Sequence, residues 1–246
     1  MTSSSNKKVI IIGATSGIGR ELAILYARSG CTVGITGRRT ELLQELKTGF
    51  PKQIETECFD VTGNDNISHL ESLLQKTGGM DLLIYNSGYG EISEQLDWTI
   101  EKATTLINVN GFIEIVHYAF NHFVQQQHGQ IAATSSIASL AGNSQAPAYS
   151  ASKAFMSVYM EGLYLKAKRL QKTGVCISIT DIQPGFVKTK MAKGKGRFWE
   201  APVDKAAKQI HRAIETKRFR AYITKRWWLI ASLIKIIPGW LYRKLG

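Results

Sequence analysis

The chain has 246 residues, of which 44% are hydrophobic and 20% are charged, and it contains no low-complexity tract or internal repeat. This composition is typical of a single folded domain and excludes a disordered or repeat protein. The formal net charge of +12 is concentrated at one end: residues 1–185 carry 15 Lys and Arg against 16 Asp and Glu, whereas residues 186–246 carry 16 against 3.

Strands and helices alternate along the first 224 residues. Short apolar runs predict buried strands, and stretches with a 3.6-residue apolar period predict helices. The strands are expected at 9–12, 31–36, 55–60, 81–85, 130–135, 176–182 and 220–224, and the helices at 19–29, 40–47, 66–76, 99–125, 149–171 and 204–215. This order predicts an α/β fold with one doubly wound parallel sheet of about seven strands flanked by helices. Such sheets bind ligands beyond the carboxyl ends of their strands.

The cysteines and the N-terminus favour a reducing compartment. Residues 1–8 are polar, and only four apolar residues follow before Gly13, which is too short an apolar stretch for a signal peptide. Cys31, Cys58 and Cys176 are an odd number without the spacing of a zinc site, so we interpret them as reduced, buried thiols. We therefore expect a cytoplasmic protein without a bound metal.

A glycine-rich turn follows the first predicted strand and opens the first predicted helix. Glycines let the backbone approach a pyrophosphate closely, and a helix N-terminus supplies N–H donors and positive potential. A turn of this kind can also be a tight turn without a ligand. Because this one connects a strand to a helix, we interpret it as a nucleotide-binding turn. Its residues are Gly13, Thr15, Ser16, Gly17, Ile18 and Gly19.

Tyr149 and Lys153 are four residues apart on one predicted helix, so their side chains share a face. An isolated pair of this kind is usually part of a solvated helix surface. However, a free tyrosine has a pKa of about 10, and a neighbouring cation lowers that pKa toward neutrality. Ser136, just after a predicted strand, is placed to hold a substrate oxygen at the phenol. The three residues suit proton transfer to or from a carbonyl or an alcohol.

Together with the glycine-rich turn, these three residues resemble the motifs of the short-chain dehydrogenase/reductase family, whose members have a single-domain Rossmann fold. The resemblance implies that Tyr149 is the general acid in reduction and the base in oxidation. It implies that Lys153 lowers the pKa of Tyr149 and binds the nicotinamide ribose, and that Ser136 polarises the carbonyl. Asn108, in preference to the neighbouring Asn110, would position a water that relays protons.

The resemblance extends over residues 7–224 and implies further cofactor contacts. They comprise a pair after the third strand that contacts the adenine, an Asn-Ser-Gly segment after the fourth strand, and a loop that holds the nicotinamide amide. These positions are Asp60, Val61, Asn86, Ser87, Gly88, Pro184, Gly185, Val187 and Thr189.

The end of the second predicted strand indicates which nicotinamide cofactor is preferred. Folds that prefer NAD carry an acidic residue there for the ribose 2′-hydroxyl. This chain has Gly37, Arg38 and Arg39 instead, so two guanidinium groups are available to bind a 2′-phosphate and no carboxylate repels it. The alternative is a pair of solvated arginines. We predict NADP(H), and by resemblance to NADP-linked family members we predict carbonyl reduction.

Residues 225–246 form a basic, tryptophan-rich tail after the predicted domain of residues 1–224. The apolar run of the tail contains Ser232 and Lys235 and ends at Pro238, well short of the roughly 20 residues that span a bilayer. One apolar stripe comprises Trp227, Ile230, Ala231, Ile234 and Ile237. Three interpretations stay open: the tail lies on a membrane surface, covers the substrate pocket, or packs against a second subunit. Nucleic-acid binding is disfavoured, because the cations surround an aliphatic stretch.

The substrate is the least determined part of the prediction. Residues 190–203 occupy the position of the family's variable substrate lid, and Phe198 and Trp199 indicate an apolar cover. With the tail, this favours a hydrophobic or lipid-like ketone. The alternatives are a catalytically silent NADP-binding scaffold or sensor, and an alcohol dehydrogenase that works in the oxidative direction. By resemblance we expect a homodimer or homotetramer, either cytoplasmic throughout or peripheral on the inner face of a membrane.

Overall fold

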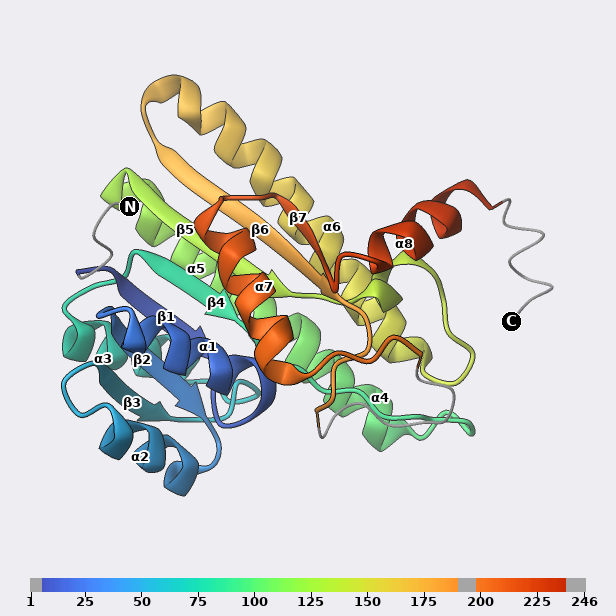
Figure 1. Cartoon of the computed structure of the whole chain (residues 1–246), viewed down its shortest axis with the longest axis horizontal. Coiled ribbons are helices and arrows are strands. Elements are labelled where there is room, and N and C mark those ends of the chain that lie inside the picture. Colours follow the sequence, from blue (N-terminus) through green and yellow to red (C-terminus); the bar gives the residue numbers. More distant parts are fainter. Residues whose placement is uncertain (1–5, 190–197, 238–246) are drawn as a thin grey trace.

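A computed structural model describes residues 6–189 and 198–237 (Figure 1). The strands within these residues are β1 (Lys8–Ile12), β2 (Thr32–Gly37), β3 (Ile54–Cys58), β4 (Leu82–Tyr85), β5 (His128–Thr134), β6 (Cys176–Pro184) and β7 (Arg220–Ile223). The α-helices are α1 (Gly17–Arg28), α2 (Thr40–Gly49), α3 (Asn66–Thr77), α4 (Trp98–Thr105), α5 (Gly111–Gln126), α6 (Pro147–Leu170), α7 (Val203–Glu215) and α8 (Trp227–Ile236). Shorter helical turns are η1 (Leu106–Asn110), η2 (Ile137–Leu140) and η3 (Gln171–Thr173).

The strands form one parallel sheet in the order β3-β2-β1-β4-β5-β6-β7. From β1, the chain builds outward through β2 and β3 on one side and then returns to place β4 on the other. This reversal leaves a crevice at the carboxyl ends of β1 and β4, where ligands of doubly wound sheets bind. The predicted fold class is confirmed.

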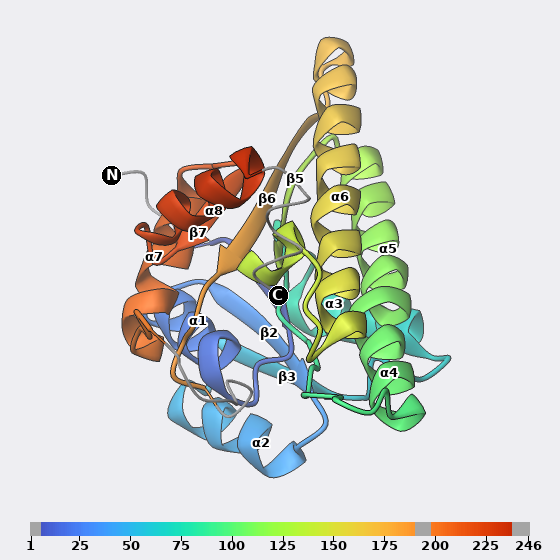
Figure 2. The same ribbon diagram turned by 90° about the vertical axis from the view of Figure 1, so that its right-hand side faces the viewer.

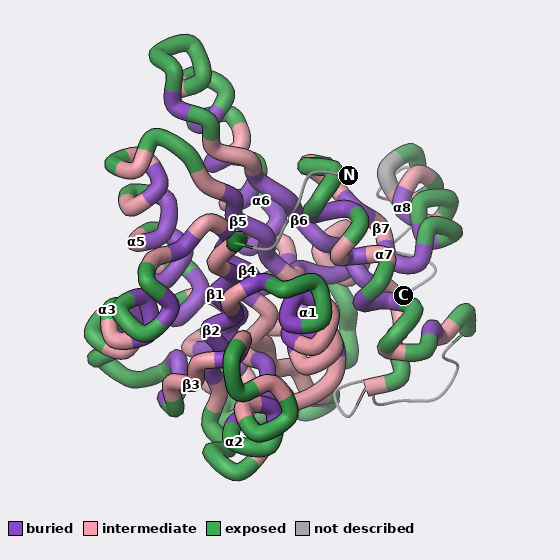
Figure 3. The backbone as a smooth tube through the Cα atoms, turned by 60° about the vertical axis from the view of Figure 1, so that its left-hand side comes forward, coloured by how far each residue is buried: buried purple, intermediate pink, exposed green. Residues whose placement is uncertain are grey.

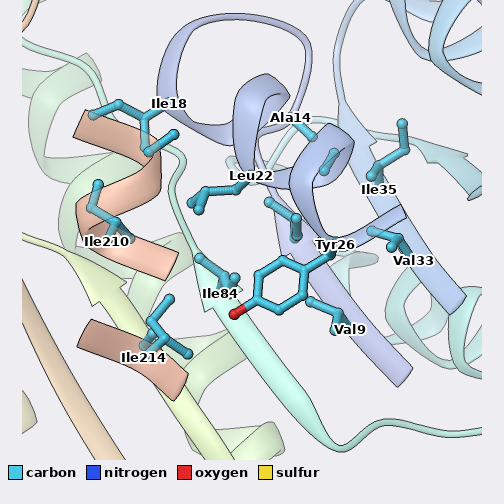
Figure 4. Close-up of a cluster of buried hydrophobic side chains, with 14 of the residues drawn as sticks. Val9, Ala14, Ile18, Leu22, Tyr26, Val33, Ile35, Ile84, Ile210 and Ile214 are labelled. Carbon is cyan, nitrogen blue, oxygen red and sulfur yellow. The ribbon is translucent and has the colours of Figure 1, made fainter. Parts of the chain in front are cut away.

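Both faces of the sheet are buried, because successive side chains of a strand point to opposite faces and helices cover each face. Val9 and Ile11 of β1 belong to the core beneath α1, α2 and α7, where Tyr26 packs among aliphatic side chains (Figure 4). Ile10 and Ile12 belong to the opposite core beneath α3, α5 and α6. Continuously apolar strands are therefore a consequence of the two helical layers, which Figure 2 shows on either side of the sheet.

The helix predicted at 99–125 is divided into α4, the π-helical turn η1 and α5. A π turn inserts an extra residue into the i→i−4 hydrogen-bond ladder, and such turns occur frequently at functional sites. Apolar periodicity continues across the turn, so the sequence pattern does not register it. Asn108 lies in this turn and is completely buried.

The prediction of buried cysteines is wrong for two of the three. Cys31 is buried, whereas Cys58 and Cys176 are exposed. Cys58 is the last residue of β3 and Cys176 is the first of β6. The strand β3 lies at the edge of the sheet, and β7 pairs with β6 only from Asp181 onward, so an apolar sequence context does not ensure burial at either cysteine.

The helix α8 packs against the body of the protein. It follows β7 and contacts η2, which lies between α8 and α6 (Figure 2). Trp227 and Ala231 of this helix are buried. Among the described helices, none has both the length and the apolar character that crossing a membrane requires. The remainder of the predicted tail, residues 238–246, lies outside the described residues.

Candidate active site

A cavity of about 1020 Å³ lies at the carboxyl ends of the strands. This volume is at the upper end of the range for ligand pockets, about 300–1,000 Å³. The structure brings nearly every predicted site residue to its wall. These residues are Gly13, Thr15, Ser16, Gly17, Ile18, Arg38, Arg39, Asp60, Val61, Asn86, Ser87, Gly88, Ser136, Tyr149, Lys153, Pro184, Gly185, Val187 and Thr189.

Gly19 and Asn108 support the cavity from behind its wall. A Cβ at Gly19 would lie 2.2 Å from the carbonyl oxygen of Gly13, so α1 can approach β1 closely only with glycine there. Asn108 accepts a hydrogen bond from the Tyr89 N–H at 2.9 Å and donates to the Tyr89 carbonyl at 2.7 Å. It also donates to Ser152 Oγ of α6 at 2.9 Å. Asn108 is thus a positioning residue, and its relay of protons through water stays a prediction.

Ser136, Tyr149 and Lys153 converge where β5 ends and α6 begins. Ser136 follows β5 and caps η2 by accepting a hydrogen bond from the Ala138 N–H at 3.1 Å. Tyr149 lies in the first turn of α6, and Lys153 lies one turn later on the same face. The Lys153 Nζ donates to the Thr134 carbonyl at 2.9 Å and lies 5.8 Å from the centroid of the Tyr149 ring.

The direction of the Tyr149 pKa shift differs from the sequence prediction. Burial raises the pKa of Tyr149 above its ordinary value, and contact with the Ser136 hydroxyl lowers it only in part. Burial also lowers the pKa of Lys153 to about 8, against the opposing effect of Asp181. The net direction of the Tyr149 pKa shift is therefore upward, because loss of solvent around the phenolate has the largest effect. Tyr149 is protonated near neutrality, which suits a proton donor.

Asp181 is a buried carboxylate that the sequence analysis missed. It lies on β6, where it accepts hydrogen bonds from Ser135 Oγ, from Ser157 Oγ at 2.7 Å and from Gln183 Nε2 at 2.8 Å. The Arg220 guanidinium of β7 is 3.3 Å from the same carboxylate. A buried charge is tolerated only with such partners. An acidic residue inside an apolar strand was the available signal for this network.

The glycine-rich turn fits a bound pyrophosphate. Gly13 and Gly17 have φ values of +86° and +59°, which other residues rarely adopt. A Cβ at Gly13 would lie 2.6 Å from Ser87 Oγ, so a side chain there would displace the segment after β4. Within the described residues, the Ser16 side chain does not cap α1. The first N–H groups of this helix therefore remain available to phosphate oxygens.

Arg38 and Arg39 lie at the cavity beside the end of β2. Arg39 donates to Ser16 Oγ at 2.8 Å and also to Thr15 Oγ1, so its guanidinium lies across the glycine-rich turn. Arg38 pairs with Asp60 at 3.3 Å and is largely exposed. An anionic group bound here would meet two guanidinium groups and one carboxylate.

Several cavity residues were not predicted as site residues. A Cβ at Gly90 would lie 2.2 Å from the Tyr149 ring, so this glycine lets the ring pack on the backbone. Trp227, Ile230 and Ile234 of α8 line the cavity as well. Within the described residues the buried Trp227 Nε1–H has no acceptor, which leaves a donor for a bound molecule. Two features of the sequence could have indicated these cavity residues. They are the glycine that follows Asn-Ser-Gly-Tyr and the apolar stripe of the tail.

The predicted lid at 190–203 is described only in part. Residues 190–197 lie outside the described residues. Phe198 and Trp199 pack on Trp227, with ring centroids 5.1 Å and 6.0 Å away. The described end of the lid and the first turn of α8 therefore form one aromatic cluster with Phe186.

Comparison with known proteins identifies the family. A family model described as short chain dehydrogenase matches residues 7–198. The chain belongs to this family. An uncharacterized oxidoreductase of Myxococcus xanthus is 33% identical over 197 residues, which cover 78% of this chain and 76% of the relative. As a short-chain dehydrogenase, the protein is an oxidoreductase that uses a nicotinamide cofactor.

Solved structures share the fold of this short-chain dehydrogenase. A short chain dehydrogenase from Bacillus anthracis has a TM-score of 0.79 at 23% identity, with 90% of this chain and 96% of that chain covered. A short-chain dehydrogenase from Sphingobium yanoikuyae, solved in complex with NADPH, has a TM-score of 0.78 at 21% identity, with 95% and 97% covered. The fold is thus supported independently of the motifs.

Proposed function

We propose that this dehydrogenase is an NADP(H)-dependent carbonyl reductase that acts on a hydrophobic ketone, with Tyr149 as the general acid. The observation that carries the proposal is the convergence of Ser136, Tyr149 and Lys153 on the cavity that also contains the glycine-rich turn. A dinucleotide cradle, an acid and a hydroxyl donor are the groups that hydride transfer to a carbonyl requires.

The residues of the chain act on the carbonyl oxygen. When bound, the reduced nicotinamide supplies a hydride to the carbonyl carbon. The Ser136 hydroxyl donates a hydrogen bond to the carbonyl oxygen, and Tyr149 transfers its proton to that oxygen as negative charge develops there. The Lys153 ammonium stabilises the phenolate that remains. Both Ser136 and Lys153 are buried, so water does not weaken these interactions.

Tyr149 has the protonation state that reduction requires. Burial raises the pKa of this phenol, so the proton that reduction consumes is present at neutral pH.

Arg38 and Arg39 support NADP(H) as the preferred cofactor. Both line the cavity at the end of β2, where NAD-preferring folds place an acidic residue. Guanidinium groups form bidentate, charge-assisted hydrogen bonds with phosphate. The similar fold from Sphingobium yanoikuyae was solved with NADPH.

Side chains of the cavity and of the protein surface support proposals on the substrate, the oligomeric state and the compartment. Apolar side chains at the cavity, among them Ile92, Ile137 and Phe186, support a hydrophobic substrate. Phe155 and Val158 of α6 expose 37% and 69% of their surface, which supports assembly of the chain into a homodimer or homotetramer. The exposed Cys58 and Cys176 are free thiols, which supports a reducing, cytoplasmic compartment.

NADPH absorbance with a panel of ketones graded by chain length and ring size tests the proposal. Turnover that rises with apolar area and depends on NADPH is the expected result. Tight NADPH binding without turnover of any ketone would instead favour the catalytically silent scaffold. Faster turnover of secondary alcohols with NADP⁺ at neutral pH would favour the oxidative enzyme.

A further inference from the structure

The helix α8 is apolar on both its inner and its outer face. On the inner face, Trp227 and Ala231 are 3% and 1% exposed, and Ile230 and Ile234 line the cavity. On the outer face, Trp228, Leu229, Leu233 and Ile236 are 57%, 57%, 55% and 79% exposed. Figure 3 shows exposed residues along the outside of this helix. A helix that is apolar all round is normally covered on all sides.

The inner face of α8 is a wall of the active-site cavity. The Trp227 ring packs so closely on Gly185 that a Cβ there would lie 2.0 Å from it. The helix also contacts η2, which begins directly after Ser136. Ile230 and Ile234 share the cavity with Tyr149. The helix α8 therefore contacts Gly185 and the turn after Ser136 on its inner face, and exposes an apolar surface on its outer face.

The apolar stripe of the tail, for which a membrane surface, the substrate pocket and a second subunit were all open as partners, faces the protein. Trp227, Ile230, Ala231 and Ile234 are the residues that pack inward. A membrane surface would instead meet the second stripe at Leu229, Leu233 and Ile236, with Trp228 beside it. These residues are spaced for one face of a helix, since i, i+4 and i+7 positions are neighbours.

The charges around α8 indicate what covers its outer face. Lys225 and Arg226 precede the helix and are exposed, and the first turn carries no acidic residue. Cations at a helix N-terminus oppose the helix dipole, so they do not stabilise α8 itself. Residues 186–246 carry 16 Lys and Arg against 3 Asp and Glu, whereas residues 1–185 are nearly neutral. An exposed apolar face that begins directly after two exposed cations, with a tryptophan at its edge, matches the chemistry of an anionic lipid surface.

We propose that the outer face of α8 docks on an anionic lipid surface, and that the cavity receives its apolar carbonyl substrate from that lipid. The substrate half of this inference rests on the proposed function, whereas the docking half does not. The helix has ten residues and lies flat on the surface, so binding is reversible and sensitive to salt. The cavity wall that α8 forms then lies one helix diameter from the lipid.

Vesicle co-sedimentation of the full chain tests the docking. Vesicles of phosphatidylcholine alone are compared with vesicles made of equal parts of phosphatidylcholine and phosphatidylglycerol. Both are measured at low and at high salt. We expect binding to the anionic vesicles, weakened by salt, and a loss of at least about tenfold in partitioning for Leu233→Glu. The matched control is Leu165→Glu on α6, where the leucine is 56% exposed against 55% for Leu233. This control should partition as the unchanged chain does.

Kinetics with two ketones test the substrate half. A water-soluble ketone is compared with a long-chain ketone dissolved in the anionic vesicles, with NADPH as the reductant. Leu233→Glu should turn over the soluble ketone within about twofold of the unchanged chain, because the side chain points away from the cavity. Its turnover of the vesicle-bound ketone should fall in proportion to its lost partitioning.

Four other results would separate lipid docking from self-association and from failure of the proposed function. If Leu233→Glu converts a larger assembly into a smaller one in light scattering and vesicle binding is absent, a second copy of the chain covers α8 and the inference is wrong. If Leu233→Glu and Leu165→Glu partition equally, the outer face is not the docking surface. If no ketone is reduced although vesicles are bound through Leu233, the proposed function fails and the docking stands. If soluble ketones are reduced but vesicles are ignored, only this inference fails.

Discussion

The two ends of the cavity differ in the chemical groups that form their walls. At the cofactor end, backbone and buried polar groups form the wall, and an added Cβ at Gly13 or Gly19 would meet other atoms at 2.6 Å or 2.2 Å. At the substrate end, the wall is formed by apolar side chains of α8 and by apolar and polar side chains of the segments after β4 and β5. A pyrophosphate requires N–H groups at fixed places, whereas an apolar substrate requires only area and shape. The cofactor end therefore tolerates little change, and the substrate end can vary.

The largest expected effect is at Tyr149. Replacing it in Tyr149→Phe removes the proton donor, so kcat for ketone reduction should fall by about 10²- to 10⁴-fold. The affinity for NADPH, measured by fluorescence titration, should change little. Tyr159→Phe is the matched control, since this tyrosine lies on the same helix and packs on Phe112 and Phe155. Wild-type turnover in Tyr149→Phe would contradict the mechanism.

The next effect concerns the cofactor end. Arg39→Ala should lower kcat/KM for NADPH by about 10- to 100-fold, because a charge-assisted hydrogen bond to the 2′-phosphate is lost. Turnover with NADH should be nearly unchanged, which serves as the internal control. Arg38→Ala should have a smaller effect, since Arg38 is more exposed and pairs with Asp60. Equal kcat/KM for NADH and NADPH in the unchanged protein would contradict the preference.

A smaller effect is expected at the substrate end. Ile234→Ala enlarges the cavity beside α8, so KM for a long-chain ketone should change by about three- to tenfold. The KM for NADPH should not change, because Ile234 belongs to the other end of the cavity. If both KM values move together, the two ends of the cavity do not bind their ligands independently.

The smallest effect on turnover is a displacement of the pH profile by Asp181→Asn. Reduction requires a charged Lys153, whose pKa is lowered to about 8, so activity should fall as the pH rises through that value. The Asp181 carboxylate raises the pKa of Lys153; removing its charge lowers that pKa further, and the fall should begin at a lower pH. Glu161→Gln is the control, since Glu161 meets Arg220 at the surface, 3.3 Å away. An identical profile in Asp181→Asn would exclude this coupling.

The cofactor end could be predicted closely from sequence. The glycines at 13, 17 and 19 have roles that depend on the absence of a side chain, and this is visible in the sequence itself. The strand predictions agree with β1 to β7 within a few residues, because both faces of the sheet are buried and the apolar runs are continuous. The π turn at Asn108 was not predictable from periodicity, since the apolar pattern continues through it.

What the sequence determined by itself was the family, the fold class and the residues that meet at the strand ends. These depend on local spacing and on the alternation of strands and helices. Only the tertiary structure decided which stripe of α8 faces the cavity, that Asp181 raises the pKa of Lys153, and that burial raises the pKa of Tyr149. These properties arise where segments far apart in the chain exclude water together. No pattern within one segment records what another segment will cover.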